Sequence, residues 1–266
     1  MLNLRLNYLI FILYVFVFSS GQLHAEQIKA ATADWQPYAM LDENGLLQGI
    51  AYEVFREILK RTNTHASVHL LPTKRLNLHF DNNLIDINFA DSPDWNPQVS
   101  NPQYLFSEPY AVVSEYIYFL KEKYLPILKP EDLMGKTVGI SFGYYYGLFE
   151  GSFNSGDVKK YEAHDSKKLI LMLKYGRIDA TFYDDVTFNY HLNQLGYSDS
   201  DFIRGLRLTQ APLTLKIRLE KQALLEKFNV AIRQMKEDGT IEKLVSKYTR
   251  MSAPMVSSEP MLSSEQ

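Results

Sequence analysis

The hydrophobic pattern of the chain switches repeatedly between a strand-like and a helix-like period. Short apolar runs that predict strands lie at 28–33, 66–71, 85–90, 111–120, 136–141, 158–161, 178–183, 202–208 and 213–219. Apolar residues at helical spacing predict helices at 51–61, 73–82, from about 145, at 166–175, from 184 or 185 to 195, at 222–237 and at 240–248, with a short helix at 131–134. Strands that alternate with helices in this way predict an α/β fold with mixed sheets flanked by helices.

Two segments, 82–91 and 175–184, carry the same pattern. In each, a helix-like run ends at Asn or Gly, which tolerate the left-handed conformation of a helix C-cap. Each continues with an Asp, a short apolar strand and a second Asp five residues after the first. Ligands of open α/β sheets bind at the carboxyl ends of strands. The echo therefore predicts two similar lobes that face one cleft; the alternative is a coincidence between two ordinary helix–strand junctions.

The two ends of the chain differ from the rest. Arg5, the apolar run 8–18 and the small residue Ala25 are typical of a cleavable export signal over residues 1–25. The alternative is a membrane anchor, but the run is well short of the roughly 20 apolar residues that span a bilayer. Residues 251–266 have little apolar periodicity and nearly repeat PM-x-SSE, so we expect a disordered tail there.

The composition narrows the compartment and the class of partner. The chain has no cysteine, which excludes disulfides, thiolate metal sites and a lipid-modified cysteine after the signal. We therefore expect the mature protein to be free in the periplasm, as a monomer. The net charge is −3 and the basic residues are scattered, which argues against a nucleic-acid partner. Most of the 18 Tyr and 15 Phe are expected in the core, with a few at a binding site.

Several short motifs occur in an order and spacing that are specific only when taken together. They are WQPY at 35–38, GLLQGIAYE at 45–53, a helix over 72–86 that ends in N-x-x-D, FSEPY at 106–110, LMGKTVGISFG at 133–143, GRIDA at 176–180 with Asp184 after it, and DGT at 238–240. Through these motifs the segment 28–248 resembles the type II periplasmic solute-binding proteins, in the family-3, amino-acid-binding-like branch. Asn83 stands where that family usually has Gly.

The resemblance implies a two-lobed α/β fold with a discontinuous first lobe. Residues 26–114 plus 210–250 would form the first lobe, and the inserted residues 115–209 would form the second. Strands 111–120 and 213–219 would cross between the lobes as a hinge, and closure about this hinge would bury a ligand. The resemblance also implies that a small polar ligand is delivered to a membrane partner, either an ABC permease or a sensor, with no cofactor.

The resemblance points to charged ligand-binding residues, with one departure. In amino-acid binders of this family an Arg shortly after the third strand holds the ligand carboxylate, but residues 92–96 (SPDWN) contain no Arg. Trp and Asn do not replace a bidentate guanidinium. Arg75 could compensate at a helix N-terminus, or it could belong to a solvated helix face. Asp184 matches the acid that takes the ligand's ammonium, or it caps the following helix.

Aromatic residues on the expected cleft loops complete the candidate site. They are Trp35, Tyr38, Trp95 and Tyr110, together with Tyr144, which follows Gly143 at a predicted helix N-terminus. Aromatic walls suit an apolar group, a planar group or a cation, and helix amides suit an anion. The alternative for each ring is structural packing.

A serine hydrolase is one enzymatic alternative. GISFG at 139–143 has the G-x-S-x-G spacing of a hydrolase elbow, with Ser141 as the nucleophile and His164 or His191 after it. The same residues belong to the motif that resembles the opening of a second lobe. We therefore expect no catalytic group here.

A dehydratase or lyase on the binding-protein fold is a second alternative, because a fold does not fix a function. Glu53, Glu108 or Asp184 would then act as acid or base. A metal site is disfavoured, since His65 and His69 on a strand would lie about 13 Å apart, too far to share an ion.

Overall fold

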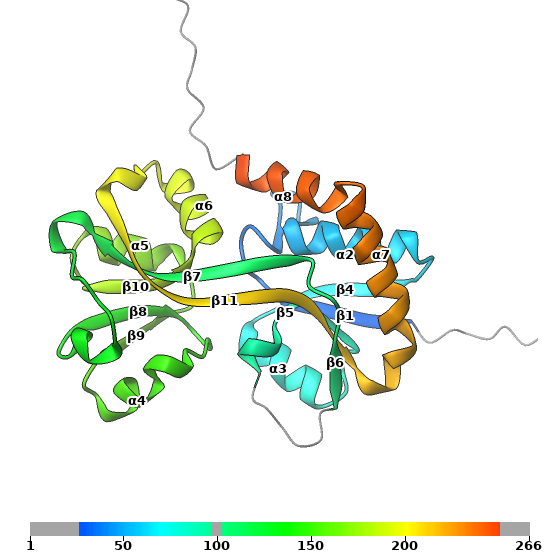
Figure 1. Cartoon of the computed structure of the whole chain (residues 1–266), viewed down its shortest axis with the longest axis horizontal. Coiled ribbons are helices and arrows are strands. Elements are labelled where there is room, and N and C mark those ends of the chain that lie inside the picture. The colour runs from blue at the N-terminus through cyan, green and yellow to red at the C-terminus, as the bar shows by residue number, and fades with distance from the viewer. Residues whose placement is uncertain (1–26, 97–102, 251–266) are drawn as a thin grey trace, which may run out of the picture.

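The computed structural model describes residues 27–96 and 103–250, and it has two α/β lobes joined by two long strands (Figure 1). The first lobe holds strands β1 (Ile28–Ala33), β4 (Ala66–Leu71), β5 (Ile87–Asp91) and β6 (Tyr104–Phe106), with helices α2 (Ile50–Arg61), α3 (Thr73–Asp81), α7 (Leu225–Glu237) and α8 (Thr240–Arg250). The second lobe holds β8 (Thr137–Ser141), β9 (Lys159–Ala163) and β10 (Ala180–Asp184), with α4 (Gly147–Ser155), α5 (Lys167–Lys174) and α6 (Asp185–Leu195). A small hairpin pairs β2 (Met40–Leu41) with β3 (Leu47–Gln48). The predicted two-lobed α/β fold class is confirmed.

The connecting strands β7 (Ala111–Leu120) and β11 (Phe202–Arg218) lie side by side and run between the lobes (Figure 1). The strand order is β4-β1-β5-β11-β7-β10-β8-β9, and β6 also pairs with β11. Each lobe has three parallel strands, and each set of three is bordered by an antiparallel connecting strand. The two connecting strands therefore lie between the two sets of parallel strands.

The prediction of two separate strands at 202–208 and 213–219 is wrong, because β11 is continuous from Phe202 to Arg218. The turn-like residues between them pair with β7, with Thr209 opposite Glu115 and Pro212 opposite Val112. Proline has no backbone N–H to donate to a neighbouring strand. It is tolerated at position 212 because β11 pairs with β5 only from Thr214 onward, so on the side away from β7 no strand requires that N–H.

The sequence echo corresponds to a repeated structure. Asn83 and Gly176 have φ of 61° and 64°, so both helices end in the left-handed conformation. The carboxylate of Asp86 accepts a 2.8 Å hydrogen bond from the amide of Lys29 in β1, and that of Asp179 accepts one of 2.8 Å from the amide of Thr137 in β8. The same helix–strand junction is thus built once in each lobe.

Each lobe has its own apolar core. In the first lobe Phe55 stacks on Phe89 with ring centroids 5.1 Å apart, and in the second Tyr118 stacks on Phe188 at 3.7 Å. Within the described ranges, the helices are too short or too polar to cross a membrane. The predicted signal peptide and the predicted tail at 251–266 lie outside the described residues.

Candidate ligand-binding site

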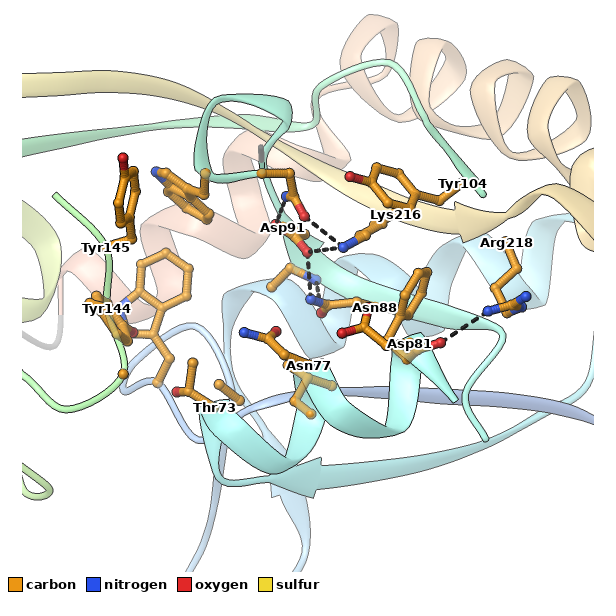
Figure 2. A pocket seen from close by; sticks show the side chains of 18 of the residues that line it. Thr73, Asn77, Asp81, Asn88, Asp91, Tyr104, Tyr144, Tyr145, Lys216 and Arg218 are labelled. Atoms are coloured by element: carbon orange, nitrogen blue, oxygen red, sulfur yellow. Dashed lines mark hydrogen bonds and ion pairs between the residues drawn. The ribbon is translucent and has the colours of Figure 1, made fainter. Parts of the chain in front are cut away.

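A cavity of about 740 Å³ lies between the two lobes, beside the connecting strands. Its first-lobe wall comes from α3, β5, β6 and the end of β11, and its second-lobe wall comes from the loop after β8 (Figure 2). Its polar and charged lining residues are Thr73, Asn77, Asp81, Asn83, Asn88, Asp91, Asn96, Gln103, Glu115, Lys216, Arg218 and Glu220. This is the place at the carboxyl ends of strands where α/β proteins bind ligands.

Four of the predicted site residues line this cavity: Trp35, Trp95, Gly143 and Tyr144. The rings of Trp35 and Trp95 meet edge to face, with centroids 5.8 Å apart. Gly143 has φ of 84°, and a Cβ there would lie 3.3 Å from Cγ of Lys74 in the other lobe, so glycine permits the close approach of the lobes. Tyr145, from the same loop, is largely exposed.

Two other predicted aromatic residues lie behind the wall. Tyr38 is 3% exposed and stacks on Trp35 at 4.1 Å, and Tyr110 is 2% exposed and donates a 2.8 Å hydrogen bond to the carbonyl oxygen of Phe89. Neither ring lines the cavity, so both support the site from the core. Arg75 lies exposed in the first turn of α3 and does not line the cavity either.

Asp184 caps helix α6, and its carboxylate is engaged on both oxygens. Oδ1 accepts a hydrogen bond from the amide of Thr187 (2.9 Å), and Oδ2 accepts one from Nε1 of Trp35 (3.2 Å). The same Nε1 lies 3.1 Å from Oγ1 of Thr187. Burial raises the pKa of Asp184, while these donors favour its charged form. Asp184 is buried and is not among the cavity-lining residues.

The Trp35–Asp184 contact joins the two lobes, and other contacts accompany it. Tyr190 of α6 donates to the sulfur of Met40 at 3.3 Å, and Nζ of Lys74 lies 3.9 Å from the ring centroid of Phe142. Three independent bridges across the cleft show that the lobes are closed on each other in this structure.

We expect Trp35→Phe to weaken this closure, because phenylalanine keeps a ring but has no N–H for Asp184 and Thr187. The loss of a hydrogen bond to a buried carboxylate should cost about 1.5–3 kcal/mol in the free energy of unfolding, measured by urea denaturation. The radius of gyration from small-angle scattering should rise in the same variant. Trp95→Phe is the matched control, since no indole hydrogen bond of Trp95 is present among the described residues. Equal effects of the two variants would contradict the bridge.

A buried lysine, which the sequence analysis did not select, lies in the first-lobe wall. Lys216 is 7% exposed; its Nζ donates to Oδ1 of Asn96 (2.6 Å) and lies 3.8 Å from Oδ2 of Asp91 (Figure 2). The rings of Phe80 and Tyr104 flank it, with centroids 4.5 and 4.1 Å away. Burial lowers the pKa of Lys216 and raises that of Asp91, and their mutual attraction opposes both shifts.

Arg218, also buried and also missed, lies two residues further along β11. Its guanidinium donates to the carbonyl oxygen of Phe80 (2.9 Å) and pairs with the carboxylate of Glu220 (3.1 Å). A sequence signal for both cations exists, because residues 213–219 read LTLKIRL and place Thr214, Lys216 and Arg218 on one face of the strand. Central strands are mostly apolar and charged residues are rarely buried, so charges at alternate positions of such a strand indicate that this face borders a polar cavity.

Glu115 is the third missed residue. It lies on β7 directly opposite Asp184 of β10 and Thr209 of β11, lines the cavity, and is 8% exposed. Its Oε2 accepts a 2.7 Å hydrogen bond from Oγ1 of Thr209. Burial, aided by repulsion from Asp184, raises the pKa of Glu115 to about 7.

A smaller hollow of about 340 Å³ contains the serine of the hydrolase alternative. The hydroxyl of Ser141 lies 2.9 Å from that of Ser166, and Nδ1 of His191 lies 3.1 Å from the hydroxyl of Tyr183. Burial lowers the pKa of His191 to about 4, and His164 packs its ring on Phe142. Within the described part of the chain, neither histidine hydrogen-bonds to Ser141, and no group of three or more His, Asp or Glu could hold a metal ion.

The geometry can be compared with known proteins. A family model described as bacterial extracellular solute-binding proteins, family 3, matches residues 28–251. The chain is 25% identical to an arginine-binding periplasmic protein of Mannheimia haemolytica over 84% of this chain and 91% of that protein. It is 27% identical to an L-cystine-binding protein of Escherichia coli (strain K12) over 80% of this chain and 79% of that protein.

Solved structures agree with this fold. An ancestral arginine-binding protein bound to arginine superposes with a TM-score of 0.68 at 24% identity, covering 84% of this chain and 97% of that chain. At this level of identity, the likeness establishes the fold and leaves the ligand to be argued from the cavity.

Proposed function

The chain belongs to the bacterial extracellular solute-binding proteins of family 3, and we propose that it closes over a small polar, amino-acid-like ligand in the cavity between its lobes. The observation that carries this proposal is the cavity itself, which brings first-lobe residues Trp35 and Trp95 against Gly143 and Tyr144 of the second lobe. Residues separated by about fifty positions and more, and coming from both lobes, thus line one cavity. We propose these four residues as ligand contacts.

The closing motion is proposed to take place about β7 and β11. The first lobe then comprises residues 26–114 plus 210–250, and the second comprises 115–209. The Trp35–Asp184 bridge joins the two, so it stabilises the closed form. Closure of this kind shields the ligand from water and presents one surface, formed by both lobes, to a partner.

The partner and the compartment follow from the family. Curated relatives are named periplasmic binding proteins, and we propose that this protein is exported by a cleavable signal and acts as a monomer in the periplasm. An ABC permease is the proposed partner, because a relative is named as the arginine-binding protein of an ABC transporter. A membrane sensor is the alternative partner.

A binding role without catalysis is the proposed chemistry. The cavity holds two acid–base pairs, Asp91 with Lys216 and Glu220 with Arg218, whose members neutralise each other and so leave Glu115 and the exposed Asp81 as the lining acids that could transfer a proton. The enzymatic alternative is a dehydratase or lyase on this fold. One observation distinguishes the binding protein from the enzyme: a binding protein leaves its ligand unchanged after prolonged incubation, whereas a dehydratase or lyase converts it.

The test is a thermal-shift screen of the mature protein purified from the periplasmic fraction. The panel holds amino acids, amines, dicarboxylates, aromatic acids and short peptides. At 100 times the dissociation constant a ligand adds about 2.7 kcal/mol, or roughly 5–10 °C in Tm at this size. A hit recovered unchanged by NMR, and weakened by Tyr144→Ala, supports the proposal. A folded protein that no compound stabilises contradicts it.

A further inference from the structure

The charged residues that line the cavity divide into paired and unpaired groups. Asp91 pairs with Lys216, and Arg218 pairs with Glu220. Asp81 and Glu115 remain as acids outside these pairs, and Asp81 is exposed at the end of α3. Glu115 is therefore the buried acid of the cavity whose charge no lining cation neutralises.

The surroundings of Glu115 contain hydroxyls and another carboxylate. Thr209 faces it from β11 and Asp184 faces it from β10. The charge of Glu115 also acts on the hydroxyls of three nearby tyrosines, Tyr38, Tyr144 and Tyr146, and raises their pKa. None of these groups is a cation. Among the described residues, Oε1 of Glu115 has no hydrogen-bond partner, whereas Oε2 is held by Thr209. No fully buried side-chain oxygen or nitrogen in the described part of the chain lacks a hydrogen-bond partner, so Oε1 is open to the cavity that Glu115 lines, where a ligand donor can reach it.

We propose that Glu115 receives a cationic amine of the ligand, and that the ligand is an organic amine whose binding needs no carboxylate. This rests on the proposed function and names its ligand class. The amine takes the place of the missing positive partner, and it relieves the repulsion between Glu115 and Asp184. Asp184 itself is committed to Thr187 and Trp35, so Glu115, its cross-strand neighbour, is the acid that remains for the ligand.

The same cavity offers little to an anion. Residues 92–96 lack an Arg, and the two buried cations are already bound: Lys216 to Asn96 and Asp91, Arg218 to Glu220 and a backbone carbonyl. A ligand carboxylate at Lys216 would have to displace Asp91 and leave that carboxylate buried without its charge complement, and at Arg218 it would compete with the exposed carboxylate of Glu220. The rings of Trp35, Trp95 and Tyr144 instead suit an apolar body behind an amine, or the amine itself.

The position of Glu115 also links ligand binding to the hinge. Its hydrogen bond to Thr209 joins β7 to β11 at the point where both strands pass from one proposed lobe to the other. A ligand held there contacts the strands about which the lobes move. The carboxyl must ionise to hold a cation, so affinity for an amine should rise with pH through the pKa of Glu115, which burial raises to about 7.

The test measures binding of matched probes by calorimetry. Agmatine and tyramine carry an amine without a carboxylate, arginine and tyrosine carry both, and N-acetyl-tyrosine carries only the carboxylate. We expect each amine to bind at least as tightly as its amino acid, and N-acetyl-tyrosine not to bind. For the amine that binds, affinity should rise by up to about 30-fold between pH 5.5 and 8, as one carboxyl ionises.

Glu115→Gln keeps the shape and can still accept from Thr209, so the fold should be retained. It should weaken amine binding by at least about 30-fold, the usual loss for one side of a buried charge pair, and abolish the pH dependence. Glu122→Gln removes the same charge from an exposed position beyond the end of β7 and should leave affinity unchanged.

The outcomes separate the two proposals. Binding of the amino acids without their amines, or tight amine binding by Glu115→Gln, overturns the assignment to Glu115 and leaves the binding function standing. A folded protein that binds neither these probes nor the wider panel overturns the binding function itself, and the assignment with it.

Discussion

Gly49→Ala is expected to destabilise the first lobe by at least about 4 kcal/mol. Gly49 precedes α2 with φ of 122° and ψ of 164°, a conformation that is essentially restricted to glycine. A Cβ there would lie 2.4 Å from the carbonyl oxygen of Tyr38, where real contacts do not occur. Backbone strain and a backbone clash therefore act together.

The clash cannot be relieved by a small movement, because the carbonyl of Tyr38 is fixed. Its oxygen accepts from the amide of Ala51 at 2.8 Å and from that of Tyr52 at 3.3 Å, at the start of α2. The amide of Gly49 itself donates to the hydroxyl of Tyr248 in α8 at 2.9 Å. Moving either the Tyr38 segment or the Gly49 segment would break hydrogen bonds that hold α2 and α8 in place.

Gly45→Ala, in the turn between β2 and β3, is the matched control. Gly45 has φ of 76°, and nothing lies within 4 Å of the position of its missing Cβ. Only the left-handed backbone is strained, so we expect about 1–2 kcal/mol. Urea unfolding measures both variants. Equal losses at the two positions would show that the Tyr38 carbonyl moves away freely and that no backbone clash adds to the strain at Gly49.

The echo of two helix–strand junctions was predictable because its signals are local. A residue with a left-handed preference, an Asp and a short apolar strand each act within a few positions, so the same letters build the same junction twice. The break expected between 208 and 213 was wrong for the opposite reason. Whether Pro212 interrupts β11 depends on whether a second strand pairs with β11 at that position, on the side away from β7. The tertiary structure decides this, and the local sequence does not.

The site was predictable where loops carry it. Trp35, Trp95 and Tyr144 line the cavity as expected from their positions after strands. Tyr38 belongs to the same WQPY loop but turns into the core, because two backbone bonds between Trp35 and Ala39, of 2.9 and 2.8 Å, close the loop into a tight turn. The motif places residues on a loop, and the backbone hydrogen bonds that close the loop decide which of them face the cavity.

The three buried charged residues of the connecting strands were not predicted, because a strand's sequence does not show which of its two faces borders a cavity. Lys216, Arg218 and Glu115 lie in strands whose apolar runs dominate the pattern. Their side chains matter only once β11 and β7 are known to run beside the cavity. Asp184 was matched to a ligand contact by motif, yet its oxygens are taken by a cap and by an indole from the other lobe.

Lys216→Met is expected to cost about 3–5 kcal/mol in the free energy of unfolding at pH 8, because it leaves the buried carboxylate of Asp91 without a positive partner. Methionine fills a similar volume between the rings of Phe80 and Tyr104, so a cavity is not the cause. Asp91 would keep only neutral donors, namely the amide of Ser92 and the side chains of Asn88 and Asn96.

The pH dependence of this loss has a definite sign. Burial raises the pKa of Asp91 above its ordinary 3.8 and Lys216 opposes the rise, so the variant should raise it further. An acid with a raised folded-state pKa binds its proton more tightly in the folded protein, which stabilises the fold at low pH and is lost as pH rises through the folded value. The deficit of Lys216→Met against the wild type should therefore be smaller at pH 5 than at pH 8.

A second substitution separates lost charge pairing from lost packing. Asp91→Asn in the Lys216→Met background removes the uncompensated carboxylate while keeping a side chain of the same size, so we expect it to recover most of the lost stability and to flatten the pH dependence. Urea unfolding at pH 5 and pH 8 measures the wild type, both single variants and the double variant. A double variant no more stable than Lys216→Met would mean that the lysine stabilises the lobe through its contacts with the two rings and Asn96 rather than through its charge pair with Asp91.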